Sequence, residues 1–163
     1  DGDGSLETVL SSPGLDGNKG GLYVFFEDPS LLNTPSGAAS DLASHRISGI
    51  SENSYFGWEL EAVGDVDGDG KDDLLATEVS FYDNSNGAVH ILSGACLDGS
   101  MDNAADAALM SWTGEEGASY FGSEAASGDI DGDGSLDVVM GSFEYNGGQT
   151  FPPGRVYIHL SSR

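Results

Sequence analysis

Cysteine is almost absent from this 163-residue chain, because Cys96 is the only one. An intrachain disulfide is therefore excluded, and a lone cysteine is more often a small buried hydrophobic residue than a nucleophile. Basic residues are also scarce. Five Lys and Arg stand against 28 Asp and Glu, which gives a formal net charge of −23. This balance argues against binding to nucleic acid or to an anionic membrane through a basic patch.

Long hydrophobic runs are missing as well. Hydrophobic residues make up 38% of the chain, which is enough for a core, but no run approaches the length of a transmembrane helix. No signal peptide is visible, and the chain begins with Asp rather than Met. We therefore expect a processed product or part of a longer protein. The lack of a disulfide does not exclude secretion, because bound metal ions can also staple a fold.

Two nine-residue segments, 65–73 and 129–137, share one pattern of acidic residues and glycine. Each carries Asp at positions 1, 3, 5 and 9 and Gly at position 6. Four carboxylates this close together repel one another unless a hard cation gathers them, and Ca²⁺ accepts six to eight oxygen ligands in flexible geometry. The glycine permits the sharp turn that directs alternate side chains inward. Residues 1–7 are a truncated copy. We interpret these segments as calcium sites.

An EF-hand would share the first nine positions of this pattern. It also requires a bidentate Glu at position 12 and a helix on each side. Position 12 is Ala76 in the first loop and Met140 in the second, and short apolar runs of strand length follow both loops. The loops are therefore expected within β-hairpins. An Asp- and Gly-rich surface turn without a metal is the remaining alternative.

The sequence repeats itself with a period of about 65 residues. Ser-Tyr-Phe-Gly occurs at 54–57 and again at 119–122, and a strand pattern that begins with glycine occurs at 20–25, 87–92 and 154–159. Each unit reads as Tyr-Phe-Gly, strand, acidic loop, strand, glycine-led strand and final strand. Four strands per unit with so long a period favour propeller blades. The predicted fold is all-β, with blades of four antiparallel strands and about two and a half blades present, a partial propeller.

The predicted blades are 1–53, incomplete and with a truncated calcium loop; 54–118, complete; and 119–163, without its last strand. Strands are predicted near 7–12, 21–27, 46–49, 58–63, 74–79, 88–93 and 108–113. Short helices are expected in 38–45 and 101–107, and an extended loop over 147–153. An open fragment exposes two apolar faces, so we expect the chain to belong to a larger propeller or to assemble with other chains.

This combination of motifs resembles FG-GAP repeats. These repeats are the blades of the integrin α-subunit propeller and occur in many secreted or surface bacterial proteins. The resemblance covers nearly the whole chain and implies a β-propeller with Ca²⁺ in hairpin loops on one rim. It also implies that Phe56 and Phe121 are wedged between blades. The Gly-Ala-Pro element of the family is degenerate, because Ala-Thr-Glu stands at 76–78 and Gly-Ser-Phe at 141–143.

The resemblance further implies a set of calcium ligands. One loop would bind through the side chains of Asp65, Asp67, Asp69 and Asp73 and the carbonyl of Lys71. The other would bind through Asp129, Asp131, Asp133 and Asp137 and the carbonyl of Ser135. The truncated copy retains only Asp1, Asp3 and Glu7, so its site is expected to be weakened or completed from elsewhere.

Catalysis is not expected. The three histidines are scattered, with His90 and His159 predicted at equivalent strand positions, and the carboxylates are those that the calcium loops require. We expect a calcium-binding segment of a secreted or cell-surface protein that serves adhesion or recognition. Its expected partner is a protein or a carbohydrate, or further copies or segments that complete the propeller. The alternatives are a structural repeat of an extracellular assembly or fibre, and a non-catalytic propeller module of a larger secreted enzyme.

Aromatic residues in the long turns are the candidates for a binding surface, namely Tyr82, Tyr145 and Phe151. The two tryptophans, Trp58 and Trp112, are instead expected to pack between blades.

Overall fold

The protein consists of short strands and single-turn helices in a computed structural model that describes residues 7–26, 37–80, 86–115, 119–145 and 153–161. The strands are β1 (Thr8–Ser11), β2 (Gly21–Phe25), β3 (His45–Ser48), β4 (Leu60–Gly64), β5 (Asp73–Glu78), β6 (Ala88–Leu92), β7 (Ala108–Thr113), β8 (Phe121–Gly128), β9 (Asp137–Ser142) and β10 (Arg155–His159). The helices are α1 (Leu15–Asn18), α2 (Ala39–Leu42), η2 (Gly94–Asp98) and α3 (Ala104–Ala107).

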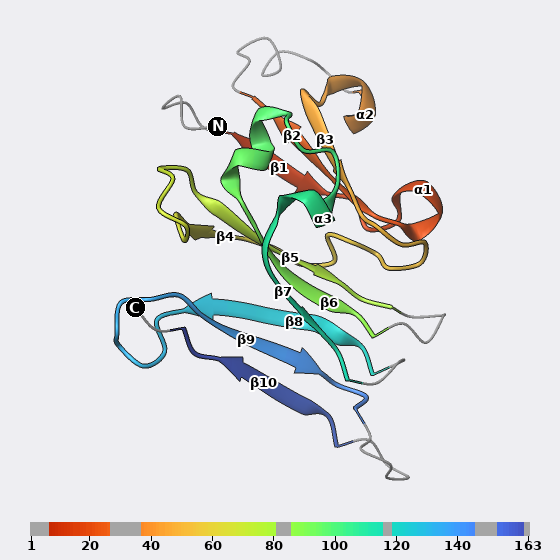
Figure 1. Ribbon diagram of the computed structural model, residues 1–163. Coiled ribbons are helices and arrows are strands. Elements are labelled where there is room, and N and C mark those ends of the chain that lie inside the picture. Colours follow the sequence, from red (N-terminus) through yellow and green to blue (C-terminus); the bar gives the residue numbers. More distant parts are fainter. Residues whose placement is uncertain (1–6, 27–36, 81–85, 116–118, 146–152, 162–163) are drawn as a thin grey trace.

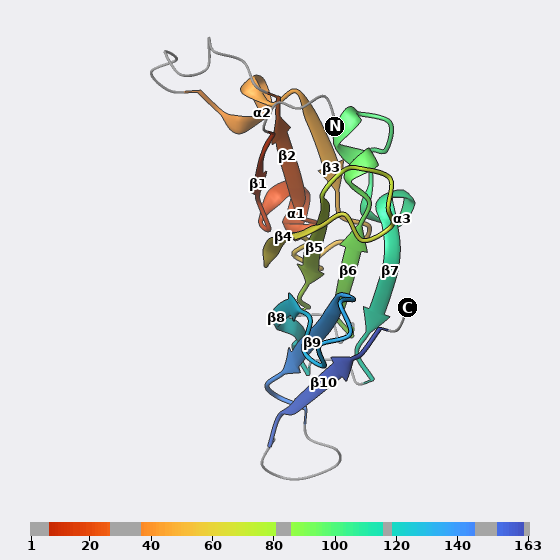
Figure 2. The ribbon, with the colours of Figure 1, turned by 90° about the vertical axis from the view of Figure 1, so that its left-hand side faces the viewer.

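The strands form three antiparallel sheets in chain order, β1-β2-β3, β4-β5-β6-β7 and β8-β9-β10. Figure 1 shows the sheets one below the other, and the side view in Figure 2 shows them stacked in one column that does not close on itself. Sheets of this size and order are the blades of a propeller. The predicted all-β partial propeller is therefore confirmed.

The predicted strands of the middle blade agree with β4 to β7 to within two residues, and those of the first blade agree with β1 to β3. Helical turns also occur where they were expected, in α2 and in α3. The loop expected over 147–153, like Tyr82, Phe151, Asp1 and Asp3, lies wholly or largely outside the described residues.

The equivalence of His90 and His159 is wrong. His90 pairs with Ala76, and Tyr157 pairs with Met140 at the same place in the third sheet. Tyr157 is therefore the counterpart of His90, and His159 is the counterpart of Leu92. The leading glycines give the same alignment, because Gly87 precedes His90 by as many residues as Gly154 precedes Tyr157.

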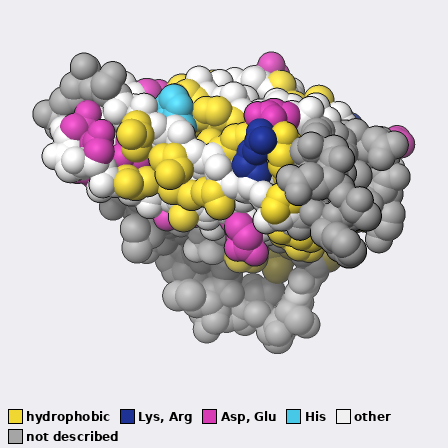
Figure 3. All heavy atoms as spheres, turned by 90° about the horizontal axis from the view of Figure 1, so that it is seen from below, with side chains coloured by type: hydrophobic (Ala, Val, Ile, Leu, Met, Phe, Trp, Pro, Cys, Tyr) yellow, Lys and Arg dark blue, Asp and Glu magenta, His cyan; other side chains and the backbone are white. Residues whose placement is uncertain are grey.

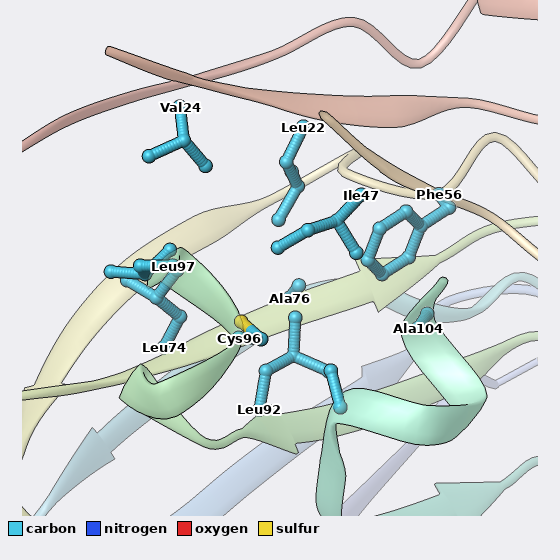
Figure 4. Close-up of a cluster of buried hydrophobic side chains, with 11 residues drawn as sticks. Leu22, Val24, Ile47, Phe56, Leu74, Ala76, Leu92, Cys96, Leu97 and Ala104 are labelled. Carbon is cyan, nitrogen blue, oxygen red and sulfur yellow. The ribbon is translucent and has the colours of Figure 1, made fainter. Parts of the chain in front are cut away.

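The core lies between the sheets rather than within one of them. Phe56 is fully buried in a cluster that joins Leu22 and Ile47 of the first sheet to Ala76 and Leu92 of the second (Figure 4). Burial of side chains from both sheets at one interface holds neighbouring blades together.

Phe121 fills the corresponding place at the next interface. It is 2% exposed and packs in a cluster with Leu75 and Ile91 of the second sheet and Val138 and Met140 of the third. Both phenylalanines therefore lie between blades, as the family resemblance implied.

Two glycines explain how the phenylalanines come so close to the preceding blade. A Cβ atom on Gly20 would lie 2.2 Å from the carbonyl oxygen of Phe56, and one on Gly87 would lie 2.2 Å from that of Phe121. Both glycines also have positive φ, 81° and 69°, a conformation that glycine adopts without strain. The glycine at the start of each strand thus leaves the space in which the backbone of the next blade's Phe-Gly pair packs.

The remaining aromatic residues behave differently from one another. Trp112 packs against the second interface, with its ring centroid 4.9 Å from that of His159. Trp58 is 44% exposed, so its assignment to the inter-blade core is wrong. Tyr145 is only 9% exposed and lies 3.7 Å beneath the Arg155 guanidinium, so it is not an open binding surface.

Candidate metal centres in two acidic loops

The acidic loops connect β4 to β5 and β8 to β9, and both lie at the same side of the stack (Figure 1). In the first loop, one carboxylate oxygen from each of Asp65, Asp67 and Asp73 lies within 4.8 Å of the other two. The second loop brings together the corresponding three residues, Asp129, Asp131 and Asp137, within the same limit.

Backbone N–H groups hold the first residue of each loop in place. Asp65 accepts hydrogen bonds from the N–H groups of Gly68 at 2.7 Å and Gly70 at 2.9 Å. Asp129 accepts them from Gly132 at 2.7 Å and Gly134 at 3.0 Å. All four glycines have φ between 81° and 89°, so the chain can fold around the carboxylate without a strained residue.

The last residue of each loop is buried and ties the loop to the strand that follows. Asp73 accepts one hydrogen bond from Val66 N–H at 2.8 Å and one from Gly94 N–H at 2.7 Å. Asp137 does the same with Ile130 at 2.8 Å and Ser161 at 2.9 Å. These carboxylates therefore fix both the loop and the turn after the glycine-led strand.

The ionised form of Asp137 is favoured by these contacts. Burial alone would raise the pKa of this carboxyl, but the N–H groups of Ile130, Ser161 and Asp131 together hold its pKa below the usual value. A carboxylate that is ionised and rigidly held is suited to binding a cation.

The donor set fits a hard divalent cation. All converging side-chain atoms are carboxylate oxygens, which Ca²⁺ and Mg²⁺ prefer. Two of the eight aspartates that are predicted ligands in these two loops do not join the converging triads. Asp69 and Asp133 instead accept the N–H of the residue two positions on, Lys71 at 2.8 Å and Ser135 at 2.7 Å. Of the truncated copy, only Glu7 lies within the described residues, directly before β1.

An open hollow of about 610 Å³ lies between the two loops. Its apolar lining includes Val66, Met110 and Leu136, and its polar lining includes Asp65 and Ser161. Residues of the second blade thus face residues of the third across one depression at the rim that carries both loops.

A second polar cluster lies at the opposite end of β5 from the acidic loop. Glu78 Oε1 and His90 Nε2 are 3.8 Å apart, and neither atom has a hydrogen-bond partner among the described residues. Both line a cavity of about 250 Å³ with Ser54 and Ser80. Burial raises the pKa of Glu78 to about 7, against the opposing effect of Ile50 N–H and the Ser54 hydroxyl. Burial lowers the pKa of His90 to about 4.

The amides of Gly94 and Ser161 and the Glu78–His90 contact were not predicted from the sequence. The two amides hold the same place after a glycine-led strand, so the repeat alignment contains the signal for them. Glu78 and His90 come together only through the β5–β6 register, and the sequence marks that register only by the glycine of the strand.

Comparison with known proteins agrees with the geometry of the loops and blades. The family model described as "FG-GAP repeat" matches residues 56–92 and 121–159. These two matches contain both acidic loops, both buried phenylalanines and the glycine-led strands of the second and third sheets.

Integrin α-subunits are among the relatives. Integrin alpha-5 of Xenopus laevis is 29% identical over 146 residues, which are 88% of this chain and 13% of that protein. Integrin alpha-V of Gallus gallus is 33% identical over 101 residues, which are 62% of this chain and 9% of that protein. The chain thus spans only a small part of the length of these relatives.

The helices within the described ranges are single turns of four or five residues, and none is long and apolar enough to cross a membrane. The matched repeats, the stacked sheets and the two acidic hairpin loops agree with one another, and the chain contains two FG-GAP repeats in an integrin-like partial β-propeller.

Proposed function

We propose that this chain is a calcium-binding, non-catalytic recognition module of a secreted or cell-surface protein. The observation that carries the proposal is the identical construction of the two loops, in which three carboxylates converge and the same backbone N–H groups hold them. Ca²⁺ would bind to Asp65, Asp67 and Asp73 in one loop and to Asp129, Asp131 and Asp137 in the other. Asp69, Asp133 and the carbonyls of Lys71 and Ser135 remain proposed ligands.

Calcium would stabilise the first hairpin of each blade that carries an acidic loop. Each loop joins the first two strands of its blade, so a cation that neutralises the three carboxylates fixes the hairpin and, through Asp73 or Asp137, the following turn. A rigid rim is suited to presenting the neighbouring loops to a partner. The blade boundaries 1–53, 54–118 and 119–163 belong to the same proposal.

A protein partner is favoured over a carbohydrate. The relatives include integrin α-subunits. Of the three candidate aromatic residues, Tyr145 is the one that lies among the described residues, and Arg155 covers its ring. The net charge of −23 favours partners with a basic surface. A location outside the cell, where calcium is abundant, agrees with sites of the moderate affinity usual for extracellular modules.

Calorimetric titration with Ca²⁺ tests the proposal in variants of one loop. We expect Asp67→Ala to abolish one binding event, because it removes a converging oxygen from the first loop and leaves the second intact. The matched control is Asp72→Ala, which removes an exposed carboxylate from the same loop but none from the triad. An equal loss of binding in both variants would show that only the general negative charge attracts calcium.

A further inference from the structure

Glu78 and His90 form a buried polar contact that neither the packing of the blades nor the acidic loops explain. Glu78 lies on β5 and His90 on β6, and they are 9% and 6% exposed. Glu78 Oε1 and His90 Nε2 are 3.8 Å apart, too far for a hydrogen bond, and neither atom has a partner among the described residues. Buried polar atoms without a partner are costly, so the pair indicates that a further group binds between them.

Each of the two side chains is held in place through its other polar atom. His90 Nδ1 contacts Ser111 Oγ at 2.8 Å, and the imidazole meets the ring of Phe56 edge-on, with the centroids 6.3 Å apart. The Glu78 carboxylate accepts a hydrogen bond from the N–H of Ile50, and its other oxygen takes this bond because Oε1 has no partner. Partners of this kind, on the atoms that face away from a metal, orient the imidazole and carboxylate ligands of metal sites.

The third sheet shows that a blade does not require a carboxylate and an imidazole at these places. Ser142 stands at the place of Glu78, and its hydroxyl donates to the Ser119 carbonyl oxygen at 2.8 Å. Tyr157 stands at the place of His90, and the first sheet carries a tyrosine there as well. The Glu78–His90 pair therefore belongs to the second sheet alone, and the shared packing of the blades does not account for it.

The space beside the two atoms is polar and large enough for a hydrated ion. A cavity of about 250 Å³ adjoins Glu78 and His90, and Ser80, Asn86 and Thr113 also line it. A water molecule has a share of about 30 Å³ in the liquid, so an ion and several waters fit. Among the described residues that line the cavity there is no Lys or Arg, so no fixed positive charge there opposes a cation.

The two unpartnered atoms select one class of metal. Imidazole nitrogen suits Zn²⁺ and similar transition metals, whereas Ca²⁺ prefers oxygen ligands alone. Two ligands at about 2.0–2.1 Å from one tetrahedral Zn²⁺ are about 3.4 Å apart. Glu78 Oε1 and His90 Nε2 would therefore have to approach each other by only a few tenths of an ångström to share the ion.

We propose that Glu78 Oε1 and His90 Nε2 bind Zn²⁺ or a similar transition metal in this cavity. Water within the cavity takes the remaining coordination positions. Ile50 and Ser54, from the segment between β3 and β4, line the same cavity, so the ion lies where the chain passes from the first sheet to the second. The site is separate from the calcium loops and does not depend on them, because it lies at the opposite end of β5 from Asp73.

Nuclear magnetic resonance of the 163-residue chain with Co²⁺ tests this site. Co²⁺ accepts the same ligands as Zn²⁺, and because it is paramagnetic it shifts and broadens the signals of nearby amides. Acidic and histidine side chains also lie at the surface, as Figure 3 shows for the side of the molecule that carries the third sheet. The titration is therefore made in millimolar Ca²⁺, which fills the acidic loops. We expect the amides of residues 76–80 and 88–92 to respond first, and Zn²⁺ to reverse the response by displacing Co²⁺.

Two variants remove one ligand each. They are Glu78→Gln and His90→Tyr, the second chosen because the other sheets carry tyrosine at this place. Loss of an outer partner alone costs about 10–100-fold in metal affinity, so we expect each variant to weaken Co²⁺ binding in the cavity by about tenfold or more. His159→Gln is the control, because His159 is partly exposed on β10 and is not part of the cavity. Its binding of Co²⁺ in the cavity should match that of the parent.

Two results would overturn the proposal. In the first, surface amides respond to Co²⁺ but those around the cavity do not, which would mean adventitious binding only and a water molecule between Glu78 and His90. In the second, the cavity responds with equal affinity in Glu78→Gln and His90→Tyr, which would assign the metal to other groups. The first result is read from the parent chain, so it is decisive even where a variant does not fold.

Discussion

At the scale of single residues, burial acts in opposite directions on the two titratable groups of the β5–β6 cavity. The pKa of Glu78 rises to about 7 and that of His90 falls to about 4, because a buried group resists the charged form. Both side chains are therefore held near neutrality in mildly acidic solution. Their opposite shifts make opposite contributions to the pH dependence of stability.

The sign of each contribution follows from proton binding. The pKa of Glu78 is raised by folding from 4.5, so its contribution to stability is full below pH 4.5 and is lost as pH rises through 7. The pKa of His90 is lowered by folding from 6.5, so its contribution is full above pH 6.5 and is lost as pH falls through 4. Each change amounts to about 3 kcal/mol, and the two oppose each other between pH 4.5 and 6.5.

Glu78→Gln should therefore reveal the contribution of His90 to the pH dependence of stability, because it removes the opposing contribution of Glu78. We expect the free energy of unfolding of this variant to rise between pH 4 and 6.5, where that of the parent is nearly flat, and not to fall between pH 6.5 and 7.5. Urea unfolding at a series of pH values measures both slopes. Parallel curves for parent and variant would contradict the assignment, and Glu52→Gln, an exposed carboxyl, is the control.

A matched pair of glycines tests how closely the next blade's Phe-Gly pair packs against the glycine-led strand. Gly87→Ala is expected to destabilise the chain by the roughly 1 kcal/mol of a positive φ and by a further 1–3 kcal/mol, approximately, for the clash with Phe121. Gly154→Ala carries the cost of a positive φ but a much smaller clash, because the atom nearest to its built Cβ, the Phe143 carbonyl oxygen, is 3.2 Å away. Thermal unfolding of the two variants gives the comparison, and equal losses would mean that Phe121 does not press on Gly87.

At the scale of elements, most of the strands could be predicted because the repeat imposes one pattern three times. The acidic loop, the Phe-Gly pair and the leading glycine mark the ends of the strands. The prediction of strands therefore depends little on the alternation of apolar and polar residues within each strand. The exposure of Trp58 could not be predicted in this way. It follows Phe56 and Gly57 directly, yet the positive φ of Gly57, 84°, turns the chain so that only the phenylalanine enters the core.

The converging triads were only partly predictable. Spacing placed all four aspartates of each loop together, but it does not show which oxygens the backbone N–H groups already occupy. Asp69 accepts the N–H of Lys71, whereas Asp73 is anchored by Gly94, the first residue of η2, which lies 21 residues further along the chain. Such a long-range contact has no local sequence signal.

Interfaces between blades should account for most of the stability. Phe121→Ala is expected to cost about 3–5 kcal/mol, because the buried ring touches two sheets. Phe143→Ala is the control. Phe143 is 54% exposed and its ring stacks on that of Tyr120 with the centroids 4.7 Å apart, so we expect a loss of less than about 1.5 kcal/mol. Equal losses in denaturant unfolding would show that the sheets are stable separately.

At the scale of the whole molecule, the stability of the stacked sheets depends on how the negative charge of the acidic loops is neutralised. The loops gather like charges at one rim, which opposes folding unless a cation is bound. For a site with a dissociation constant near 10⁻⁴ M, about 1 mM free Ca²⁺ would stabilise the folded state by about 1.4 kcal/mol. Two such sites would be a large share of the stability of a small domain.

Removal of calcium should therefore lower the melting temperature. We expect a chelator to lower it by several degrees, on the order of 5–10 °C for two sites, and added Ca²⁺ to restore it. The double variant Asp67→Ala/Asp131→Ala should melt at the same temperature with and without chelator. A chelator effect that persists in this variant would place the stabilising metal elsewhere.

Native mass spectrometry of the purified chain, with and without a chelator, tests the central claim most directly, because it counts bound ions on the intact particle. We predict two Ca²⁺ ions in the loops at 65–73 and 129–137, one fewer in Asp131→Ala, and none after chelation. A chain that carries no calcium at millimolar concentration of the ion would contradict the claim, and the acidic loops would then be turns that hydrogen bonds alone hold together.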